Sequence, residues 1–190
     1  MIPLHRNISG TPRWLRTLSH LRPRAPGQVA PWLVDTGSLT RRVVRACPGR
    51  MQVRVLRQVW GRADAGEISA LGIDRHGRVW LREVQLLCDD QPWVYARTVI
   101  PAATLAGPAR CLLRLGSRPL GAVLFANPAV IRGGVEVACL QPHHRLYQRA
   151  ALSAAAMPTV LWGRRSLFWL GERPLLVAEV FLPAPGSPAG

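Results

Sequence analysis

The chain has 190 residues, of which 48% are hydrophobic, and its formal net charge is +15. This length is most simply one domain with a sizeable core, and the apolar content excludes wholesale disorder. All 25 basic residues are arginines, scattered along the sequence, so the charge indicates anionic partners in general and argues only weakly for nucleic acid. No apolar run reaches the roughly 18 residues of a spanning helix, so we expect no stable membrane insertion.

The domain organisation follows from composition along the chain. Residues 1–29 are predicted to be a poorly ordered basic lead-in, which lacks the apolar core and cleavage site of a secretory signal. We therefore expect a cytoplasmic protein, with a mitochondrial presequence as the alternative. Residues 30–185 form the domain, within which 141–159 is an insertion loop, and 186–190 are a disordered tail.

Within the domain, hydrophobic periodicity and breaker residues predict the elements. In chain order they are two short helices in 30–46 with Ser38 or Thr40 near the second start, a strand at 51–60, two strands between Trp80 and Pro101, helical segments in 102–127 broken at Pro108 and Pro119, strand-like alternation over 129–140, and a final strand pair in 161–183.

A spaced pattern, W-x-R-x9-P-x4-(R/E)-x3-P, occurs twice. The matched positions are Trp80 and Trp162, Arg82 and Arg164, Pro92 and Pro174, Arg97 and Glu179, Pro101 and Pro183. Such a repeat indicates a duplicated β-hairpin unit. We therefore predict a single α+β domain with a six-stranded, mostly antiparallel sheet and helices covering one face.

Arg82 and Arg97 stand in apolar runs where a strand would normally place hydrophobic residues. If the loop of the hairpin between them is even, both lie on one face of the sheet, within reach of one ligand. An odd loop would place them on opposite faces. Glu179 lies in a similar apolar run, and a buried carboxylate is costly unless it is paired.

These charges have two interpretations. One is a structural ion pair of Glu179 with Arg82 or Arg97. The other is a polar pocket in the sheet face, with two guanidinium groups for a small anion and one carboxylate for a hydroxyl. Arg164 either adds to the positive lining or is exposed. Glu83 alternates to the face opposite Arg82, where we expect a solvated or helix-facing role.

The four cysteines, Cys47, Cys88, Cys111 and Cys139, have no C-x-x-C spacing. A zinc site is therefore not expected, and we predict free thiols in a reducing compartment. The sequence also contains no Gly-rich phosphate loop and no nucleophile elbow.

Two long blocks resemble the chorismate pyruvate-lyase family: WLREVQLLCDDQPWVYARTVIPAATLAGPARCLLRLGSRPLGAVLF and LWGRRSLFWLGERPLLVAEVFLP. The resemblance implies a six-stranded antiparallel sheet built from a duplicated motif. It also implies conversion of chorismate to 4-hydroxybenzoate and pyruvate, the first committed step of ubiquinone biosynthesis, without cofactor or metal. We expect a monomer, because no exposed heptad or long apolar edge demands a partner.

The same resemblance implies roles for particular residues. Arg82 of W-L-R-E would bind the ring carboxylate, and Glu179 of the last strand would contact the ring hydroxyl. Leu120 of P-L-G and Leu39, where methionine is common, would contribute backbone contacts. To these we add Arg97 as a catalytic candidate for the enolpyruvyl carboxylate or the ether oxygen.

The chemistry requires no protein nucleophile, because the C4 hydrogen of chorismate can pass directly to the enolpyruvyl methylene while the ring becomes aromatic. The protein would hold the side chain in place and stabilise the departing oxygen. Glu179 would act as an orienting group or as a general base.

The alternative function is a non-catalytic small-molecule-binding domain of the UTRA type, whose fold this family resembles. Regulators with that domain carry an upstream helix-turn-helix, for which the first 30 residues are too short and too proline-rich. A nucleic-acid-binding protein is a third reading, which rests on charge alone and predicts steeply salt-dependent duplex binding.

Overall fold

The computed structural model describes residues 10–153, 158–184 and 186–189. They form one α+β domain around a seven-stranded antiparallel sheet, which confirms the predicted fold class. The strands are β1 (Met51–Gly61), β2 (Val79–Cys88), β3 (Gln91–Pro101), β4 (Val130–Arg132), β5 (Glu136–Leu140), β6 (Leu161–Leu170) and β7 (Arg173–Phe181). The α-helices are α1 (Ala30–Val34), α2 (Leu39–Ala46), α3 (Ala65–Leu71), α4 (Leu120–Ala126) and α5 (Arg145–Ala151), and the 3-10 helices are η1 (Leu18–His20), η2 (Ala102–Leu105) and η3 (Gly107–Arg114).

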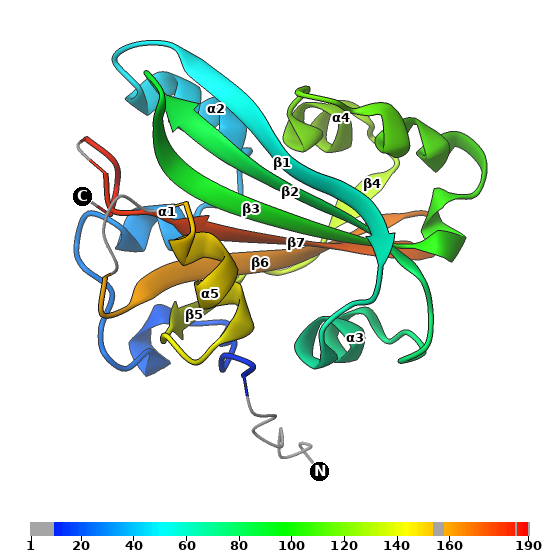
Figure 1. Ribbon diagram of the computed structural model, residues 1–190, viewed down its shortest axis with the longest axis horizontal. Helices are drawn as coiled ribbons and strands as arrows, with labels where there is room; N and C mark the ends of the chain where they lie inside the picture. Colours follow the sequence, from blue (N-terminus) through cyan, green and yellow to red (C-terminus); the bar gives the residue numbers. More distant parts are fainter. Residues whose placement is uncertain (1–9, 154–157, 185, 190) are drawn as a thin grey trace.

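The strand order is β1-β2-β3-β7-β6-β4, and β5 also pairs with β6 (Figure 1). The two copies of the repeat are the hairpins β2–β3 and β6–β7, which lie side by side because β3 pairs with β7. The strand count exceeds the predicted six. The alternating stretch after α4 forms two short strands, β4 and β5, separated at Gly133 and Gly134.

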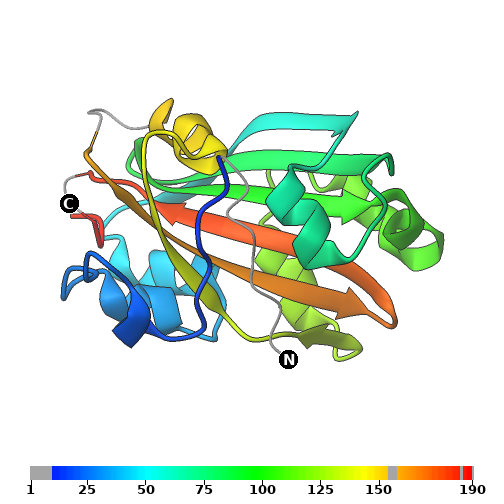
Figure 2. The ribbon, with the colours of Figure 1, turned by 90° about the horizontal axis from the view of Figure 1, so that it is seen from below.

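The sheet has two covered faces. We call the face with Arg82 and Glu179 the front face, and the face with Glu83 and Arg97 the back face. Helices α1, α2, α4 and η3 pack on the front face, whereas α3 and α5 pack on the back face (Figures 1 and 2). The prediction that helices cover one face is therefore wrong. Nearly every position of β2 is buried, as in strands covered on both sides.

The register of the β2–β3 hairpin decides where its two arginines point. The hairpin turns through the two residues 89–90, both with positive φ (45° and 67°), so its loop is even. Beyond the turn, however, the register shifts. Leu87 pairs with Pro92 and Leu86 pairs with Val94, so Trp93 is an extra residue on β3 without a partner on β2. A slip of one residue moves every later side chain to the other face. Arg97 consequently lies opposite Glu83 on the back face, and the prediction that it shares a face with Arg82 is wrong.

Arg97 forms a buried ion-pair cluster that holds α3 against the sheet. Its Nε donates to Glu67 Oε1 at 2.7 Å, its Nη2 donates to Glu67 Oε2 at 3.1 Å, and its Nη1 donates to Glu83 Oε1. Burial alone would lower the pKa of Arg97. The hydrogen bonds and negative charges of these carboxylates outweigh burial, so the pKa is raised above its usual value. The arginine is therefore fully paired within the protein.

Asp64, at the start of α3, extends this cluster to α5 by accepting hydrogen bonds from Arg149 and Arg145. Burial alone would raise the pKa of Asp64, but the two arginines lower it below its usual value. A carboxyl whose pKa is lower in the folded than in the unfolded state stabilises the fold above about pH 4, and this contribution is lost as the pH falls further. We expect the unfolding free energy of Asp64→Asn to fall less steeply below about pH 4 than that of the wild type. Urea titrations at several pH values measure both slopes, and equal slopes would contradict the assignment.

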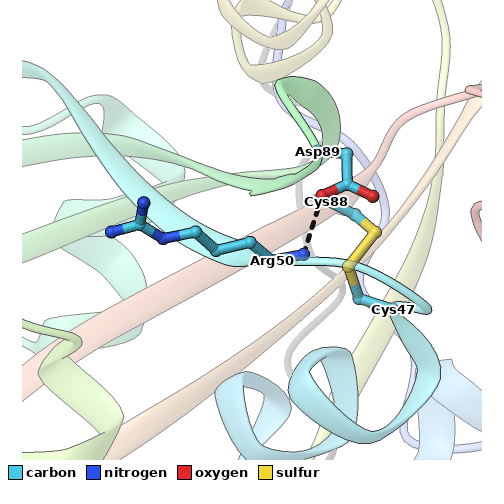
Figure 3. Close-up of a disulfide and its surroundings, with 4 residues drawn as sticks. All are labelled: Cys47, Arg50, Cys88 and Asp89. Carbon is cyan, nitrogen blue, oxygen red and sulfur yellow. Dashed lines mark hydrogen bonds between the residues drawn. A yellow bond between two sulfur atoms is a disulfide. The ribbon is translucent and has the colours of Figure 1, made fainter.

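Cys47 and Cys88 form a disulfide, with 5.6 Å between their Cα atoms (Figure 3). Cys47 directly follows α2, and Cys88 ends β2. Beside the bond, the backbone N–H of Arg50 donates to Asp89 Oδ1 at 2.7 Å. The prediction of free thiols is therefore wrong for this pair, because only the packing of α2 on the sheet brings two residues 41 positions apart together. Cys111 and Cys139 remain free.

This disulfide should contribute strongly to stability. Closing a loop of 41 residues stabilises the fold by roughly 4 kcal/mol in the chain-entropy model, and by 2–4 kcal/mol in typical proteins. We expect Cys47→Ser with Cys88→Ser to lower the unfolding free energy by about that amount in urea titrations. The matched control is Cys111→Ser with Cys139→Ser, which should keep the sensitivity to a reductant. Equal unfolding midpoints for wild type with and without reductant would refute the prediction.

The ends of the described chain are packed on the domain. In the expected lead-in, Leu15 bridges to Val137, and Leu21 and Val29 are buried in the core. In the expected tail, the hydroxyl of Ser187 donates to the Leu182 carbonyl. Residues 10–29 and 186–189 thus differ from the prediction of disorder, and residues 1–9 and 190 lie outside the described part.

The segment predicted as an insertion loop, 141–159, contains helix α5, whose buried side chains pack on the back face. Residues 154–157 of this segment lie outside the described residues. Among the described residues, none of the helices has the length and apolar character needed to cross a bilayer.

Candidate functional site

A pocket opens on the front face, between the sheet and the first turns of α2 and α4. Its empty volume is about 610 Å³, part of which is open to solvent. Most of the lining is apolar, from residues such as Val84, Leu86 and Phe168. The charged lining consists of Arg82, Arg132, Arg164 and Glu179.

Arg82 reaches the pocket from β2 with only 2% of its surface exposed. Its Nη2 donates to the carbonyls of Gly116 and Arg118, both at 3.0 Å, in the loop that leads into α4. Its Nε is buried and has no partner among the described residues. Burial lowers the pKa of Arg82, and a buried cation of this kind is stabilised by an anionic ligand.

Glu179 on β7 is paired with Arg164, its direct neighbour on β6. Arg164 Nε donates to Glu179 Oε2 at 2.6 Å, and Arg164 Nη1 donates to the carbonyls of Trp32 and Asp35 at 2.8 and 2.6 Å. The expected structural partner of Glu179 was Arg82 or Arg97, whereas the structure supplies the repeat-equivalent of Arg82. Glu179 is therefore ion-paired, with a partner other than those predicted, and it also lines the pocket.

Arg132 of β4 is the third cation of the pocket, and it was not among the residues predicted from the sequence. Its Nε donates to Ser166 Oγ at 3.2 Å, and its Nη1 donates to the carbonyls of Thr36 and Gly37, the latter at 3.1 Å. Its guanidinium also lies 5.4 Å from the ring centre of Phe168. The only signal in the sequence was an arginine in a short strand-like stretch, which is not distinctive.

The two leucines line the same pocket. Leu39 is the first residue of α2, and Leu120 is the first residue of α4. The N–H groups of the first helical turn have no carbonyl partner within the helix, so both leucines can offer backbone contacts to a bound molecule. The start of α2 agrees with the sequence prediction, because Ser38 Oγ accepts a hydrogen bond from the Arg41 amide at 3.5 Å.

The structure thus brings together four of the five predicted site residues: Arg82, Glu179, Leu39 and Leu120. The fifth, Arg97, faces the opposite side of the sheet and is paired with Glu67 and Glu83. We therefore withdraw it as a catalytic candidate. In the part of the chain that the structure describes, no group of three or more His, Cys, Asp or Glu side chains could hold a metal ion.

Solved structures with a similar fold include bacterial transcription regulators and an effector domain of one. The effector domain of PhnF from Mycobacterium smegmatis matches with a TM-score of 0.55 at 16% identity, covering 78% of this chain and 93% of that domain. A GntR-family regulator from Bacillus cereus matches with a TM-score of 0.52 at 16% identity, covering 70% and 92%. At these identities the likeness shows the fold alone.

Sequence relatives are much closer. The family model described as chorismate lyase matches residues 13–186. A probable chorismate pyruvate-lyase of Aromatoleum aromaticum is 45% identical over 164 residues, covering 85% of this chain and 88% of the relative. The chorismate pyruvate-lyase of Serratia proteamaculans is 39% identical over 170 residues, covering 90% and 87%. The chain therefore belongs to the chorismate lyase family.

Proposed function

We propose that the chain is a chorismate pyruvate-lyase, which converts chorismate to 4-hydroxybenzoate and pyruvate. The observation that carries this proposal is the charge of the front-face pocket. Its lining has three arginines, Arg82, Arg132 and Arg164, and one carboxylate, Glu179, which leaves two positive charges in excess. Chorismate is a dianion with one carboxylate on the ring and one on the enolpyruvyl group, so its charge complements that of the pocket.

The pocket residues have distinct roles in this proposal. Arg82 binds the ring carboxylate, using the guanidinium donors that its two carbonyl contacts leave over. Glu179 accepts a hydrogen bond from the C4 hydroxyl. The backbone amides at the starts of α2 and α4, from Leu39 and Leu120, complete the contacts with the ring.

The reaction needs little beyond positioning. The hydrogen on C4 moves to the enolpyruvyl methylene, the C3–O bond breaks, and the enol C–O bond becomes the carbonyl of pyruvate. The ring is left aromatic, as 4-hydroxybenzoate, and all atoms are accounted for. The protein holds the side chain over the C4 hydrogen and stabilises negative charge on the departing oxygen.

Glu179 acts in this scheme as an orienting group. Its 2.6 Å hydrogen bond with Arg164 fixes the carboxylate in place on β7, and that support favours a hydrogen-bond acceptor over a base that must move or change charge. Its role as a general base is the alternative. The test uses chorismate deuterated at C4. Deuterium that appears in the methyl group of pyruvate without exchange with solvent would favour the orienting role.

The deciding experiment mixes purified protein with chorismate and follows 4-hydroxybenzoate by chromatography and pyruvate by a coupled assay. We expect equal amounts of both products without added metal or cofactor. Products at only the spontaneous rate, with chorismate or a benzoate still bound, would overturn the proposal and favour a non-catalytic small-molecule-binding domain of the UTRA type.

We also propose that the product feeds ubiquinone biosynthesis as its first committed step. Cells that lack the gene should lose ubiquinone and regain it when 4-hydroxybenzoate is added to the medium. Loss of ubiquinone that 4-hydroxybenzoate does not restore would place the protein elsewhere in metabolism.

A further inference from the structure

We propose that Arg132 and the free Nη2 of Arg164 form a second anion subsite, which binds the enolpyruvyl carboxylate of the substrate and then the carboxylate of pyruvate. This inference rests on the proposed function and deepens it. Arg82 would recognise the ring carboxylate, whereas Arg132 and Arg164 would recognise the carboxylate of the leaving side chain. Arg97, which was the predicted candidate for this carboxylate or for the ether oxygen, lies on the other face of the sheet.

The first support is the charge of Arg132. Its hydrogen bonds go to neutral oxygens, the hydroxyl of Ser166 and the carbonyls of Thr36 and Gly37. The pocket carboxylate, Glu179, is hydrogen-bonded to Arg164 instead. Arg132 therefore brings a positive charge to the pocket that a ligand carboxylate would balance.

The second support is the unmatched donor of Arg164. This side chain is 1% exposed, and its Nη2 is buried without a partner among the described residues. Its Nε and Nη1 are used by Glu179 and by the carbonyls of Trp32 and Asp35. A buried donor without an acceptor is costly in free energy, and a carboxylate bound in the pocket would supply the acceptor.

The two arginines also influence each other. The pKa of Arg132 is lowered, first by burial and then by the positive charge of Arg164, and the carboxylates of Glu179 and Asp35 offset this only in part. The two guanidinium groups repel each other, and an anion bound between them would reduce this repulsion. The pair is thus suited to a carboxylate and not to a neutral group.

The third support is the order of the residues across the sheet. Arg82 lies on β2, Glu179 on β7, Arg164 on β6 and Arg132 on β4, and the sheet places these strands in that same order. In chorismate, the ring carboxylate is opposite the C4 hydroxyl, and the enolpyruvyl ether is on the carbon next to that hydroxyl. Strands two positions apart are roughly 10 Å apart. A ring that spans from Arg82 to Glu179 therefore directs its enolpyruvyl group towards β6 and β4.

The test compares two ligands that differ in the enolpyruvyl group. Arg132→Gln should lower kcat/KM for chorismate by about 30-fold or more, as expected when a buried charge pair loses one partner. The same variant should change the Kd of 4-hydroxybenzoate, measured by calorimetry, by less than about threefold, because that ligand lacks the second carboxylate. Arg132→Lys, which keeps the charge but not the fork, should lie between wild type and Arg132→Gln.

The matched control is Arg41→Gln, which removes the same charge from an exposed position of α2 outside the pocket and should leave both values unchanged. Binding of 4-hydroxybenzoate reports whether the pocket of each variant is intact. Equal weakening of both ligands by Arg132→Gln, or no change in either, would overturn the subsite. If the wild type binds chorismate without turnover, the proposed reaction fails, and the Kd of chorismate replaces kcat/KM in the same comparison.

Discussion

Replacing Arg82 with alanine should lower kcat/KM for chorismate by roughly two to four orders of magnitude. This factor corresponds to a loss of about 3–5 kcal/mol of transition-state stabilisation. The side chain is 2% exposed, and two loop carbonyls hold its Nη2 at 3.0 Å. The guanidinium is therefore fixed before the ligand arrives. Steady-state kinetics with chorismate measure the effect.

The conservative variant makes this prediction sharper. Arg82→Lys keeps the charge but loses the planar guanidinium, whose Nη2 holds the two loop carbonyls while its other donors remain for a carboxylate. We expect its kcat/KM to fall as well, and both Arg82 variants should also bind 4-hydroxybenzoate more weakly, unlike the Arg132 variants. An Arg82→Lys protein with wild-type kinetics would refute the assignment of the ring carboxylate to Arg82.

Replacing Arg97 with alanine should instead lower the stability of the fold by about 3–5 kcal/mol. The change leaves the carboxylates of Glu67 and Glu83 on the buried back face without their cation. Urea unfolding followed by circular dichroism measures the loss. In protein that remains folded, the KM for chorismate should stay near the wild-type value, because Arg97 lies on the opposite side of the sheet from the pocket.

A double variant separates this structural role from a catalytic one. Arg97→Met with Glu83→Leu removes both charges of one pair and leaves Glu67, of the two carboxylates, without its cation. Apolar pairs of similar volume often restore part of the stability that a broken ion pair loses. We expect this double variant to be more stable than Arg97→Ala and to keep lyase activity. A stable Arg97→Ala protein without activity would show that Arg97 acts in the reaction after all.

The sequence by itself determined the features that depend on local spacing. The repeated W-x-R pattern predicted two hairpins, and these are β2–β3 and β6–β7. Strand alternation placed Arg82 and Glu179 among apolar neighbours, where a charge needs a partner or a ligand. Ser38 and Thr40 were the two residues predicted near the start of α2, and Ser38 is its N-cap. Each of these features follows from the periodicity of strands and helices within a few residues.

The tertiary structure alone decided which charges meet. An extra residue at Trp93 moved Arg97 to the back face, and no local pattern marks a register shift that packing selects. The disulfide of Cys47 and the approach of Arg132 to the pocket join segments far apart in the chain. Such contacts depend on how α2 and β4 pack on the completed sheet, because the spacing of residues along one strand carries no information about the element that will lie beside it.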